Sequence, residues 1–471
     1  MGADVLAVLP ELTLLVGAVV CLLLGSWTPR GRQHRVGAVA ALASLIGAGF
    51  AVVGLMDGPT SAFSGTIAID EATGVLRLVI TLALVILLVL ARGEIANHPR
   101  ESEVYVLLLL GADGVLLLGA ATDLAVLVVA FLLASIPLYG LVGLSAGKAA
   151  PEAALKTYLV GALSGILLML GASVLFGLIG STAYSDLDDE LSAAPSAAAV
   201  AGVVLLLTGL LFKAGAVPAH FWVPDAVQGS WITSAAFLTT VPKLGAVLAL
   251  ARLLDHLPSE NHWVLLVAGL AAVSMTVGNL AALTQEDVRR LLAWSTISQV
   301  GYLLAVAASV TRTDQALPTL MLFVAGYAVT NLACFAVLAA EPDRLSINQW
   351  RGLARRRPVL VASLGVGLLG LVGTPPTAVF VAKLLTITVT WEADLQWLAV
   401  LVALNTVLSL AYYLRWLAAC LSSPDYAEPR GNDDSSALTA PCLAAAPVAA
   451  VCAVAAVALG VVAGPVLALV G

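Results

Sequence analysis

Residues 210–221, which read LLFKAGAVPAHF, decide how the rest of the chain is interpreted. They close a long apolar run in which Lys213 stands five residues before Pro218. A proline inside such a run removes a backbone hydrogen bond and breaks the helix. Broken helices with an ionisable group at membrane depth are typical of ion-transport sites. The segment therefore indicates movement of protons or other cations across a membrane.

Residues 368–383, which read LLGLVGTPPTAVFVAK, have the same construction. An apolar helix is interrupted by glycine and by the adjacent Pro375 and Pro376, and Lys383 follows nearby. About five predicted spans separate the two segments, which suggests two five-span repeats. An odd number of spans in each repeat implies that the two repeats are inverted relative to each other.

A third lysine, Lys243, directly follows Pro242 inside another apolar run. The chain has only five lysines against 17 arginines, so lysine at these buried positions is unlikely to reflect composition alone. A buried arginine keeps its proton, whereas a buried lysine can release it. Lys213, Lys243 and Lys383 are therefore the predicted proton carriers.

Composition places the whole chain in a membrane. It is 61% hydrophobic and 11% charged, whereas soluble domains carry about 25% charged residues. Its apolar runs are continuous, which excludes the alternating pattern of membrane-spanning strands. We predict an all-α polytopic membrane protein of about 14 transmembrane helices, with two inverted five-helix repeats that each contain a broken helix. The predicted parts are a three-span segment (1–102), a first inverted repeat (103–254), a second inverted repeat (255–421) and a C-terminal span (422–471).

The distribution of positive charge predicts the orientation. Nearly all loop lysines and arginines follow alternate spans, and the opposite set of loops carries essentially one, Arg312. By the positive-inside rule the charged loops face the cytoplasm, so both termini face outward. The formal net charge of −7 gives no indication of a nucleic-acid partner.

No signal for a metal or cofactor is found. The five cysteines are scattered and have no metal-ligand spacing. No glycine-rich phosphate loop or dinucleotide fingerprint follows a predicted strand. We expect this chain to bind no cofactor of its own.

Seven local motifs are spread along nearly the whole chain: residues 9–11 (LPE), 135–139 (SIPLY), 152–158 (EAALKTY), 212–225 (FKAGAVPAHFWVPD), 241–243 (VPK), 288–302 (VRRLLAWSTISQVGY) and 373–378 (GTPPTA). In this order they resemble the antiporter-like proton-translocating family of respiratory complex I, the bacterial NADH–quinone oxidoreductase. The N-terminal motif and the chain length favour subunit N within that family. The resemblance implies two inverted five-helix bundles that each contribute a half-channel.

The resemblance assigns roles to the lysines. Lys213 fits the family's lysine on broken span 7, Lys243 the linking lysine on span 8, and Lys383 the lysine on broken span 12 that opens outward. In that family a glutamate on span 5 pairs with the span 7 lysine. Here the glutamate position is Leu132.

Asp113 is the predicted replacement for that glutamate. It lies ten residues before Asp123, and Leu132 lies nine after it. At about 1.5 Å per residue, the two positions share one depth on adjacent antiparallel helices. Two alternatives remain: Asp113 bonds a nearby hydroxyl or backbone group or faces a hydrated crevice, or this chain no longer pumps and acts as a spacer.

Two further groups have open interpretations. Glu152 and Lys156 are four residues apart, so they can pair on one helix face, and a stabilising ion pair is favoured over transport. His220 flanks the cytoplasmic end of span 7, where it could feed protons inward or cap a helix. A lysine beside a proline, such as Lys243 after Pro242, could also pair with a freed backbone carbonyl.

The resemblance also implies a place in the cell and a set of partners. The chain would be a proton-translocating subunit in the bacterial inner membrane, with lipid and other membrane subunits of complex I around it. NAD, FMN, iron–sulfur clusters and quinone would be bound by partner subunits. The alternatives are a subunit of a multi-subunit cation/proton antiporter or membrane hydrogenase, and a non-pumping structural subunit because of Leu132.

Overall fold

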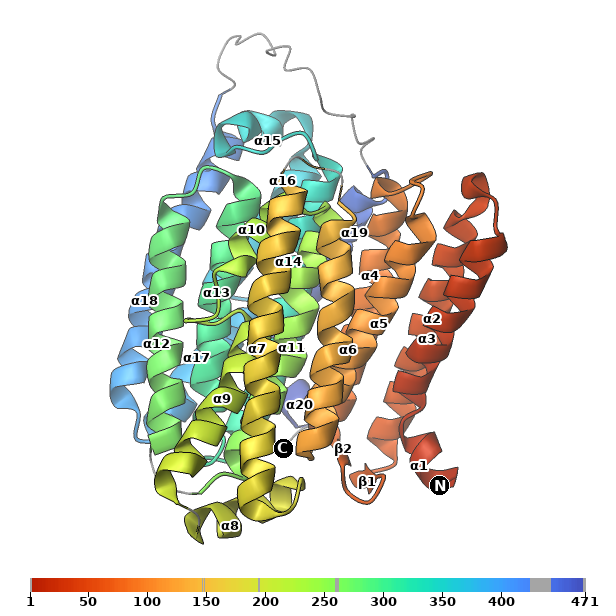
Figure 1. The fold of residues 1–471 in the computed structure, drawn as a ribbon. Helices are drawn as coiled ribbons and strands as arrows, with labels where there is room; N and C mark the ends of the chain where they lie inside the picture. The colour runs from red at the N-terminus through yellow and green to blue at the C-terminus, as the bar shows by residue number, and fades with distance from the viewer. Residues whose placement is uncertain are drawn as a thin grey trace.

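The computed structural model describes residues 2–145, 147, 149–193, 195–258, 262–423 and 442–468. In this part of the chain nearly all regular structure is helical, as predicted, and long helices run side by side in one bundle (Figure 1). The first half contains α1 (Gly2–Ala7), α2 (Leu9–Trp27), α3 (His34–Met56), α4 (Glu71–Glu94), α5 (Glu101–Ala120), α6 (Leu124–Gly143), α7 (Ala150–Ile179), α8 (Leu187–Ala193), α9 (Ser196–Ala214), α10 (Trp222–Gly229) and α11 (Ile232–Asp255). The second half contains α12 (His262–Leu283), α13 (Val288–Ala307), α14 (Ala316–Ala340), α15 (Leu353–Arg356), α16 (Pro358–Val372), α17 (Ala378–Glu392), α18 (Gln396–Leu421), α19 (Ala445–Val461) and α20 (Ala463–Leu467).

Eleven of the described helices are long and apolar enough to cross a membrane. The helix α13 has 20 residues but is less apolar than these eleven, since it carries Arg289, Arg290 and several hydroxyl and amide groups. The helices α16, α17 and α19 are apolar but shorter. The chain is therefore a multi-pass membrane protein, and the count of 14 spans and the repeat boundaries remain predictions. Much of the predicted C-terminal part, residues 424–441, lies outside the described residues.

A small β-hairpin interrupts the all-helical pattern between α3 and α4. Its strands are β1 (Thr60–Ala62) and β2 (Ile67–Ile69), paired antiparallel. The turn between them holds Phe63, Ser64 and Gly65 with positive φ angles. The two strands pair their backbone N–H and C=O groups with each other, as backbone polar groups require. The hairpin is short, so the chain is still classed as all-α.

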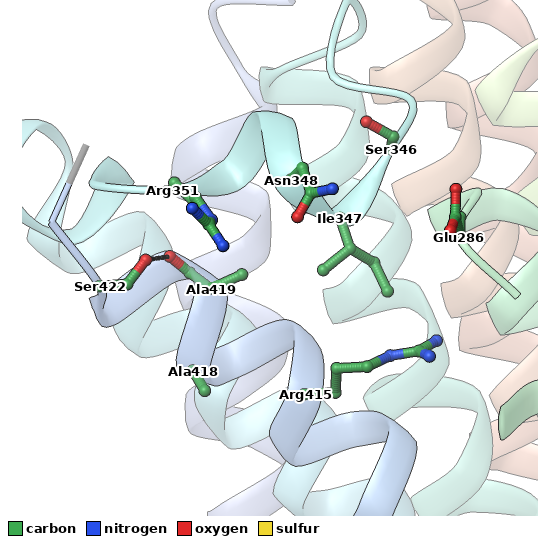
Figure 2. A pocket seen from close by; sticks show the side chains of 9 residues that line it. All are labelled: Glu286, Ser346, Ile347, Asn348, Arg351, Arg415, Ala418, Ala419 and Ser422. Atoms are coloured by element: carbon green, nitrogen blue, oxygen red, sulfur yellow. Dashed lines mark hydrogen bonds between the residues drawn. The ribbon is translucent and has the colours of Figure 1, made fainter. Parts of the chain in front are cut away.

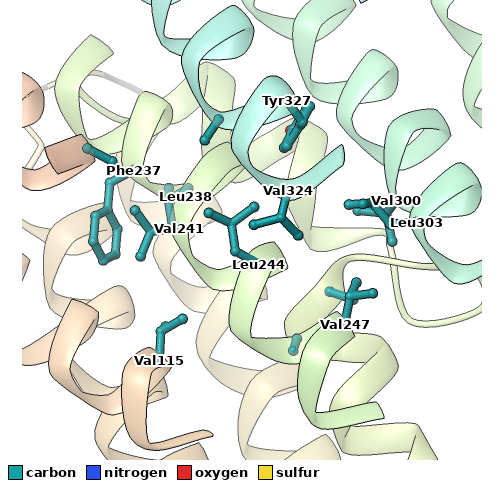
Figure 3. Packing of buried hydrophobic residues seen from close by; sticks show 14 of the residues in the cluster. Val115, Phe237, Leu238, Val241, Leu244, Val247, Val300, Leu303, Val324 and Tyr327 are labelled. Carbon is teal, nitrogen blue, oxygen red and sulfur yellow. The ribbon is translucent and has the colours of Figure 1, made fainter. Parts of the chain in front are cut away.

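Two helices form the centre of the bundle. Nearly every residue of α11 and α14 is buried, as expected for helices that are apolar on all sides. Val115 of α5 approaches α11 on one side, and Val300 and Leu303 of α13 approach it on the other (Figure 3). Lys243 therefore lies on the helix with the least access to lipid.

The N-terminal helices lie at the edge of the bundle. The helix α2 packs against α3 and α5, and α3 also packs against α4. Many leucines and valines on α2 and α3 are exposed, which in a membrane protein means contact with lipid or with another membrane protein. The helices α1 and α20 lie at the same end of the bundle, opposite α15 (Figure 1).

Candidate functional site

Both predicted helix breaks are present, and they are built alike. The helix α9 ends at Ala214 and is followed by Gly215 at φ 79°, while α16 ends at Val372 and is followed by Gly373 at φ 90°. An L side chain rarely adopts such a φ, whereas glycine does so without strain. In each case the residue after the glycine donates its N–H five residues back, from Ala216 to Leu211 and from Thr374 to Leu369.

The prolines stand at the same place in both breaks. Pro218 follows Gly215 by three residues, and Pro376 follows Gly373 by three. The helical course resumes as α10 after the first break and as α17 after the second. Pro242, in contrast, lies inside α11 without ending it.

All three predicted lysines are buried and lie over aromatic rings. Lys213 and Lys243 are fully buried, and Lys383 is 3% exposed. The distances from Nζ to the ring centroid are 5.0 Å for Lys213 and Phe131, 4.7 Å for Lys243 and Trp222, and 4.1 Å for Lys383 and Tyr302. An aromatic face attracts a cation without neutralising it, so each ring can stabilise a protonated lysine that has no carboxylate partner.

Lys213 lies in the last turn of α9 and donates a hydrogen bond to Ser135. The distance from Nζ to Oγ is 2.6 Å, and Ser135 itself donates to the carbonyl of Phe131. Leu132, the position of the missing glutamate, is 36% exposed. Ser135 is therefore the polar side chain that the structure places at Lys213.

Lys243 lies against the first break. A β-carbon built on Gly215 would lie 3.4 Å from its Nζ, which places the ammonium at the end of α9. The carboxyl end of a helix carries a partial negative charge that favours a cation. Its Nζ has no hydrogen-bond partner among the described residues, so the alternative pairing with a carbonyl freed by Pro242 is not observed. The helices of Lys243 and Lys213, α11 and α9, pack against each other.

Lys383 lies against the second break in the corresponding way. Its Nζ donates to the carbonyls of Leu371 and Val372, at 2.9 and 3.0 Å, which are the last carbonyls of α16. Its side chain also contacts Gly373, whose β-carbon would lie 3.0 Å from Cδ. Each break thus holds one ammonium group at the carboxyl end of its first half-helix.

Hydrogen-bonded side chains connect the helix of Lys243 with α13 and α14. Asn331 donates to the hydroxyls of Thr239 and Thr240, at 3.0 and 2.9 Å. Tyr327 donates to the Thr239 carbonyl at 2.6 Å and to the Thr296 hydroxyl at 3.3 Å. This cluster leads from α11 across α14 to α13.

The helix α13 continues the connection to Lys383. Gln299 follows Thr296 by three residues, so both lie on one face of α13. Its amide donates to the carbonyl of Leu371 at 2.8 Å, the carbonyl that also accepts Lys383. The hydroxyls of Ser298 and Tyr302 are buried nearby without hydrogen-bond partners among the described residues, as expected where waters complete a network.

Asp113 does not contact Lys213. It lies on α5 at the depth of Leu132, as predicted, because a β-carbon on the adjacent Gly114 would meet the backbone of Leu133 and Ala134 at 2.5 and 2.3 Å. No hydrogen bond or ion pair joins Asp113 to Lys213 in the described part of the chain. The replacement role of Asp113 is therefore supported by depth alone.

The remaining predicted residues lie near the end of the bundle where α7 and α13 begin. Lys156 pairs with Glu152 at 2.7 Å and with Asp225 at 2.8 Å, so the predicted ion pair is present and extends to α10. Arg290 of α13 binds the other oxygen of Asp225 at 2.7 Å. His220 is buried in the first break, with its ring 5.5 Å from that of Trp294.

Glu94 is a residue that sequence reasoning missed. Its carboxylate accepts the N–H groups of Ile232 and Thr233 at 2.6 and 2.8 Å, and so caps the first turn of α11. The local sequence gives no such signal, because Glu94 lies 138 residues before Ile232. The hydroxyls of Thr233 and Ser234 beside this cap are buried and have no partner among the described residues.

Two cavities open at the ends of the bundle. One of about 380 Å³ lies beside Asn348, Arg351 and Arg415, with Arg415 bound to the Leu283 carbonyl at 2.8 Å (Figure 2). The other, of about 550 Å³, lies beside Arg312 and Glu392 at the end of α17. The described residues contain no group of three or more histidine, cysteine, aspartate or glutamate side chains arranged for a metal.

Comparison with known proteins identifies similar sequences along the whole chain. Residues 121–409 match the family model described as NADH:quinone oxidoreductase/Mrp antiporter, TM. The NADH-quinone oxidoreductase subunit N of Mycobacterium sp. (strain JLS) is 50% identical over 456 residues, which cover 97% of this chain and 96% of that protein.

Solved structures share the fold. A chain of respiratory complex I from Thermus thermophilus with bound aureothin has a TM-score of 0.81 and 30% identity, with 98% of each chain covered. A chain of the Mrp complex from Dietzia sp. DQ12-45-1b has a TM-score of 0.85 at 20% identity, covering 99% of this chain and 96% of that one, which shows a common fold.

Proposed function

This chain belongs to the subunit N proteins of the NADH:quinone oxidoreductase/Mrp antiporter family, and on that premise we propose that Lys213, Lys243 and Lys383 carry protons across the membrane. It is a membrane subunit of NADH-quinone oxidoreductase, and its part in the reaction is translocation. Electron transfer from NADH to quinone takes place in partner subunits, which supply NAD, FMN, iron–sulfur and quinone sites.

The observation that carries this proposal is a line of three buried lysines joined by polar side chains. Lys243 stands at the first break and Lys383 at the second, and the Thr239–Asn331–Tyr327–Thr296 cluster with Gln299 spans the distance between them. A chain of hydroxyl and amide groups with water between them can pass a proton, which an apolar core cannot.

Transfer along the line is driven by charge. Charges interact strongly in the low dielectric of a membrane protein, so a proton bound at one lysine changes the proton affinity of the next. We expect Lys213 and Lys243 to be coupled in this way, since α9 and α11 pack against each other and Lys243 reaches the end of α9. With Leu132 in place of the glutamate, Ser135 and the ring of Phe131 are the groups that stabilise charge on Lys213.

The assignment extends to the surroundings of the chain. It resides in the bacterial inner membrane with both termini on the outer side, packed against other membrane subunits of complex I and lipid. The exposed apolar faces of α2 and α3 are suited to either neighbour.

Substitution of the central lysine tests the proposal. Lys243→Met removes the proton-accepting amine but keeps a flexible apolar side chain. We expect the complex to assemble and oxidise NADH, while the number of protons pumped per NADH falls in proteoliposomes. Lys156→Met is the matched control, because Lys156 is an exposed lysine of an ion pair and lies outside the line.

A non-pumping structural role is the alternative function, and Leu132 at the glutamate position favours it, since Ser135 is the hydrogen-bond partner of Lys213 among the described residues. Unchanged proton yield in both Lys243→Met and Lys213→Met would establish that role. A sodium or cation/proton antiporter subunit would instead show ion exchange in vesicles that hold no NADH-oxidising partner subunits.

A further inference from the structure

A second group of ionisable side chains lies in the N-terminal part of the bundle, apart from the three lysines. Arg77 of α4 binds Glu11 of α2 through two hydrogen bonds, from Nε to Oε1 at 2.7 Å and from Nη2 to Oε2 at 2.9 Å. The two side chains are only 3% and 5% exposed. Paired hydrogen bonds of this kind hold both groups in one geometry and leave no net charge.

Asp113 of α5 is the neighbour of this ion pair. It is 2% exposed, and its Oδ1 is buried without a hydrogen-bond partner among the described residues. The helices α2 and α5 run antiparallel and pack closely, since β-carbons on Gly17 and Gly25 would lie 3.8 Å from Leu109 Cδ1 and 2.6 Å from Ser102 Cβ. This register brings Glu11 to the depth of Asp113. The carboxyl group of Asp113 thus lies near that of Glu11, and the positive partner of Glu11, Arg77, is already bound in the ion pair.

The charges of this cluster do not balance if Asp113 is ionised. Arg77 compensates Glu11, and one negative charge would then remain at membrane depth with an unbonded oxygen. Burial of an isolated carboxylate without hydrogen bonds is far more costly than burial of the neutral acid. A bound proton removes the excess charge.

Glu101, on the same helix, is a buried carboxyl group whose two oxygens both accept hydrogen bonds. It is 1% exposed, and it accepts hydrogen bonds from the Asn97 N–H and from the Tyr105 hydroxyl, both at 2.9 Å. Asp113 lacks donors of this kind. The two acids therefore differ in surroundings although they differ little in burial.

Among the described residues, no hydrogen bond or ion pair joins Asp113 to a positively charged side chain of the helices around α5. The helix α6 carries no charged residue, and Arg252 of α11 is bound to Asp70 and to the Gly119 carbonyl. The remaining charged side chains of α3, α4 and α11 that could be considered are His34, Arg35, Glu71, Arg92, Glu94, Lys243 and Asp255.

We propose that Asp113, together with the Glu11–Arg77 ion pair, forms a proton-binding site separate from the lysine line, in which Asp113 holds one proton. Glu11 is the positioning residue of this site, since a second negative charge beside its carboxylate at membrane depth would be repelled.

Infrared spectroscopy of the assembled complex tests this site without reference to pumping. A protonated carboxyl has a carbonyl stretch that an ionised carboxylate lacks. We expect the difference spectrum of wild type and Asp113→Asn to contain one protonated-carboxyl band that shifts in heavy water. Glu101→Gln, the matched control, should remove carboxylate bands and leave the protonated band in place.

The role of Glu11 has its own variant. Glu11→Gln removes the neighbouring negative charge and frees Arg77, so the protonated band of Asp113 should be lost or shifted at the same pH. Loss of carboxylate bands alone in Asp113→Asn would overturn the proposal, and an unaltered band in Glu11→Gln would overturn the part assigned to Glu11. If Asp113→Asn fails to assemble, isotope labelling of aspartate carboxyls in the unmutated complex must move the protonated band, or the assignment is wrong.

Discussion

At the scale of single residues, the three lysines share one environment although their sequence contexts differ. Each is buried over an aromatic ring, and two of them lie at the carboxyl end of a half-helix. Lys213 differs from the other two in its hydrogen bond, which it donates to the hydroxyl of Ser135. In this chain a neutral hydroxyl occupies the place near Lys213 where the family resemblance led us to expect a carboxylate.

Ser135→Ala tests how far Lys213 depends on that hydroxyl. A hydrogen bond to a charged group contributes about 1.5–3 kcal/mol, and alanine leaves the ammonium without it. We expect the proton-pumping rate in proteoliposomes to fall while NADH oxidation by the complex is retained. Ser173→Ala is the control, since Ser173 is an exposed hydroxyl that bonds only its own helix. An equal pumping rate in both variants would remove Ser135 from the pathway.

At the scale of helices, the continuous apolar runs predicted the all-helical class, and the glycine–proline segments predicted both breaks. The segments 210–221 and 368–383 contain the ends of α9 and α16. Local sequence could not predict that Lys383 reaches back across its break to the Leu371 carbonyl, or that Glu94 caps α11. Both contacts depend on how distant segments pack.

The cap on α11 predicts a loss of stability in Glu94→Ala. Removal of a side-chain cap costs about 0.5–2 kcal/mol, because backbone N–H groups lose their acceptor. We expect a lower thermal midpoint of the purified complex and a reduced pumping rate, since α11 carries Lys243. Glu190→Ala, at an exposed position of α8, should change neither quantity. A midpoint equal to that of the control would show that water replaces the cap.

The close contact between α12 and α13 predicts a second loss of stability, in Gly278→Ala. A β-carbon on Gly278 would lie 2.5 Å from the Ser298 nitrogen, and one on Gly301 would lie 2.5 Å from the Met275 nitrogen. Small residues of this kind allow membrane helices to approach closely. Gly278→Ala should therefore destabilise the packing by about 1–3 kcal/mol, as overpacking does.

Thermal unfolding and the yield of assembled complex measure this effect. Gly269→Ala is the control on the same helix, since nothing lies within 4 Å of a β-carbon there. If Gly278→Ala matches Gly269→Ala, the backbones of α12 and α13 can separate without loss, and the close approach is not needed for stability.

At the scale of the whole molecule, orientation is the prediction that remains to be measured. The described cysteines are all buried, which gives a low background for labelling. We expect a membrane-impermeant maleimide to label Asp188→Cys in intact cells, where the outer side is accessible. The same reagent should label Arg355→Cys in inverted vesicles, where the cytoplasmic side is accessible. Asp188 is an exposed residue of α8, and Arg355 is an exposed residue of α15 at the opposite end. The reverse labelling pattern would invert the topology.

The placement of lysine at the two breaks has a consequence for recognising such proteins from genomes. The ammonium at the first break comes from a neighbouring helix, 28 residues after Gly215, whereas the one at the second break comes ten residues after Gly373 on the same broken span. A search pattern with one fixed glycine-to-lysine interval would find one half of this chain and miss the other. An alignment of the two halves should accordingly match their glycine–proline breaks and should not require the lysines to occupy equivalent helices.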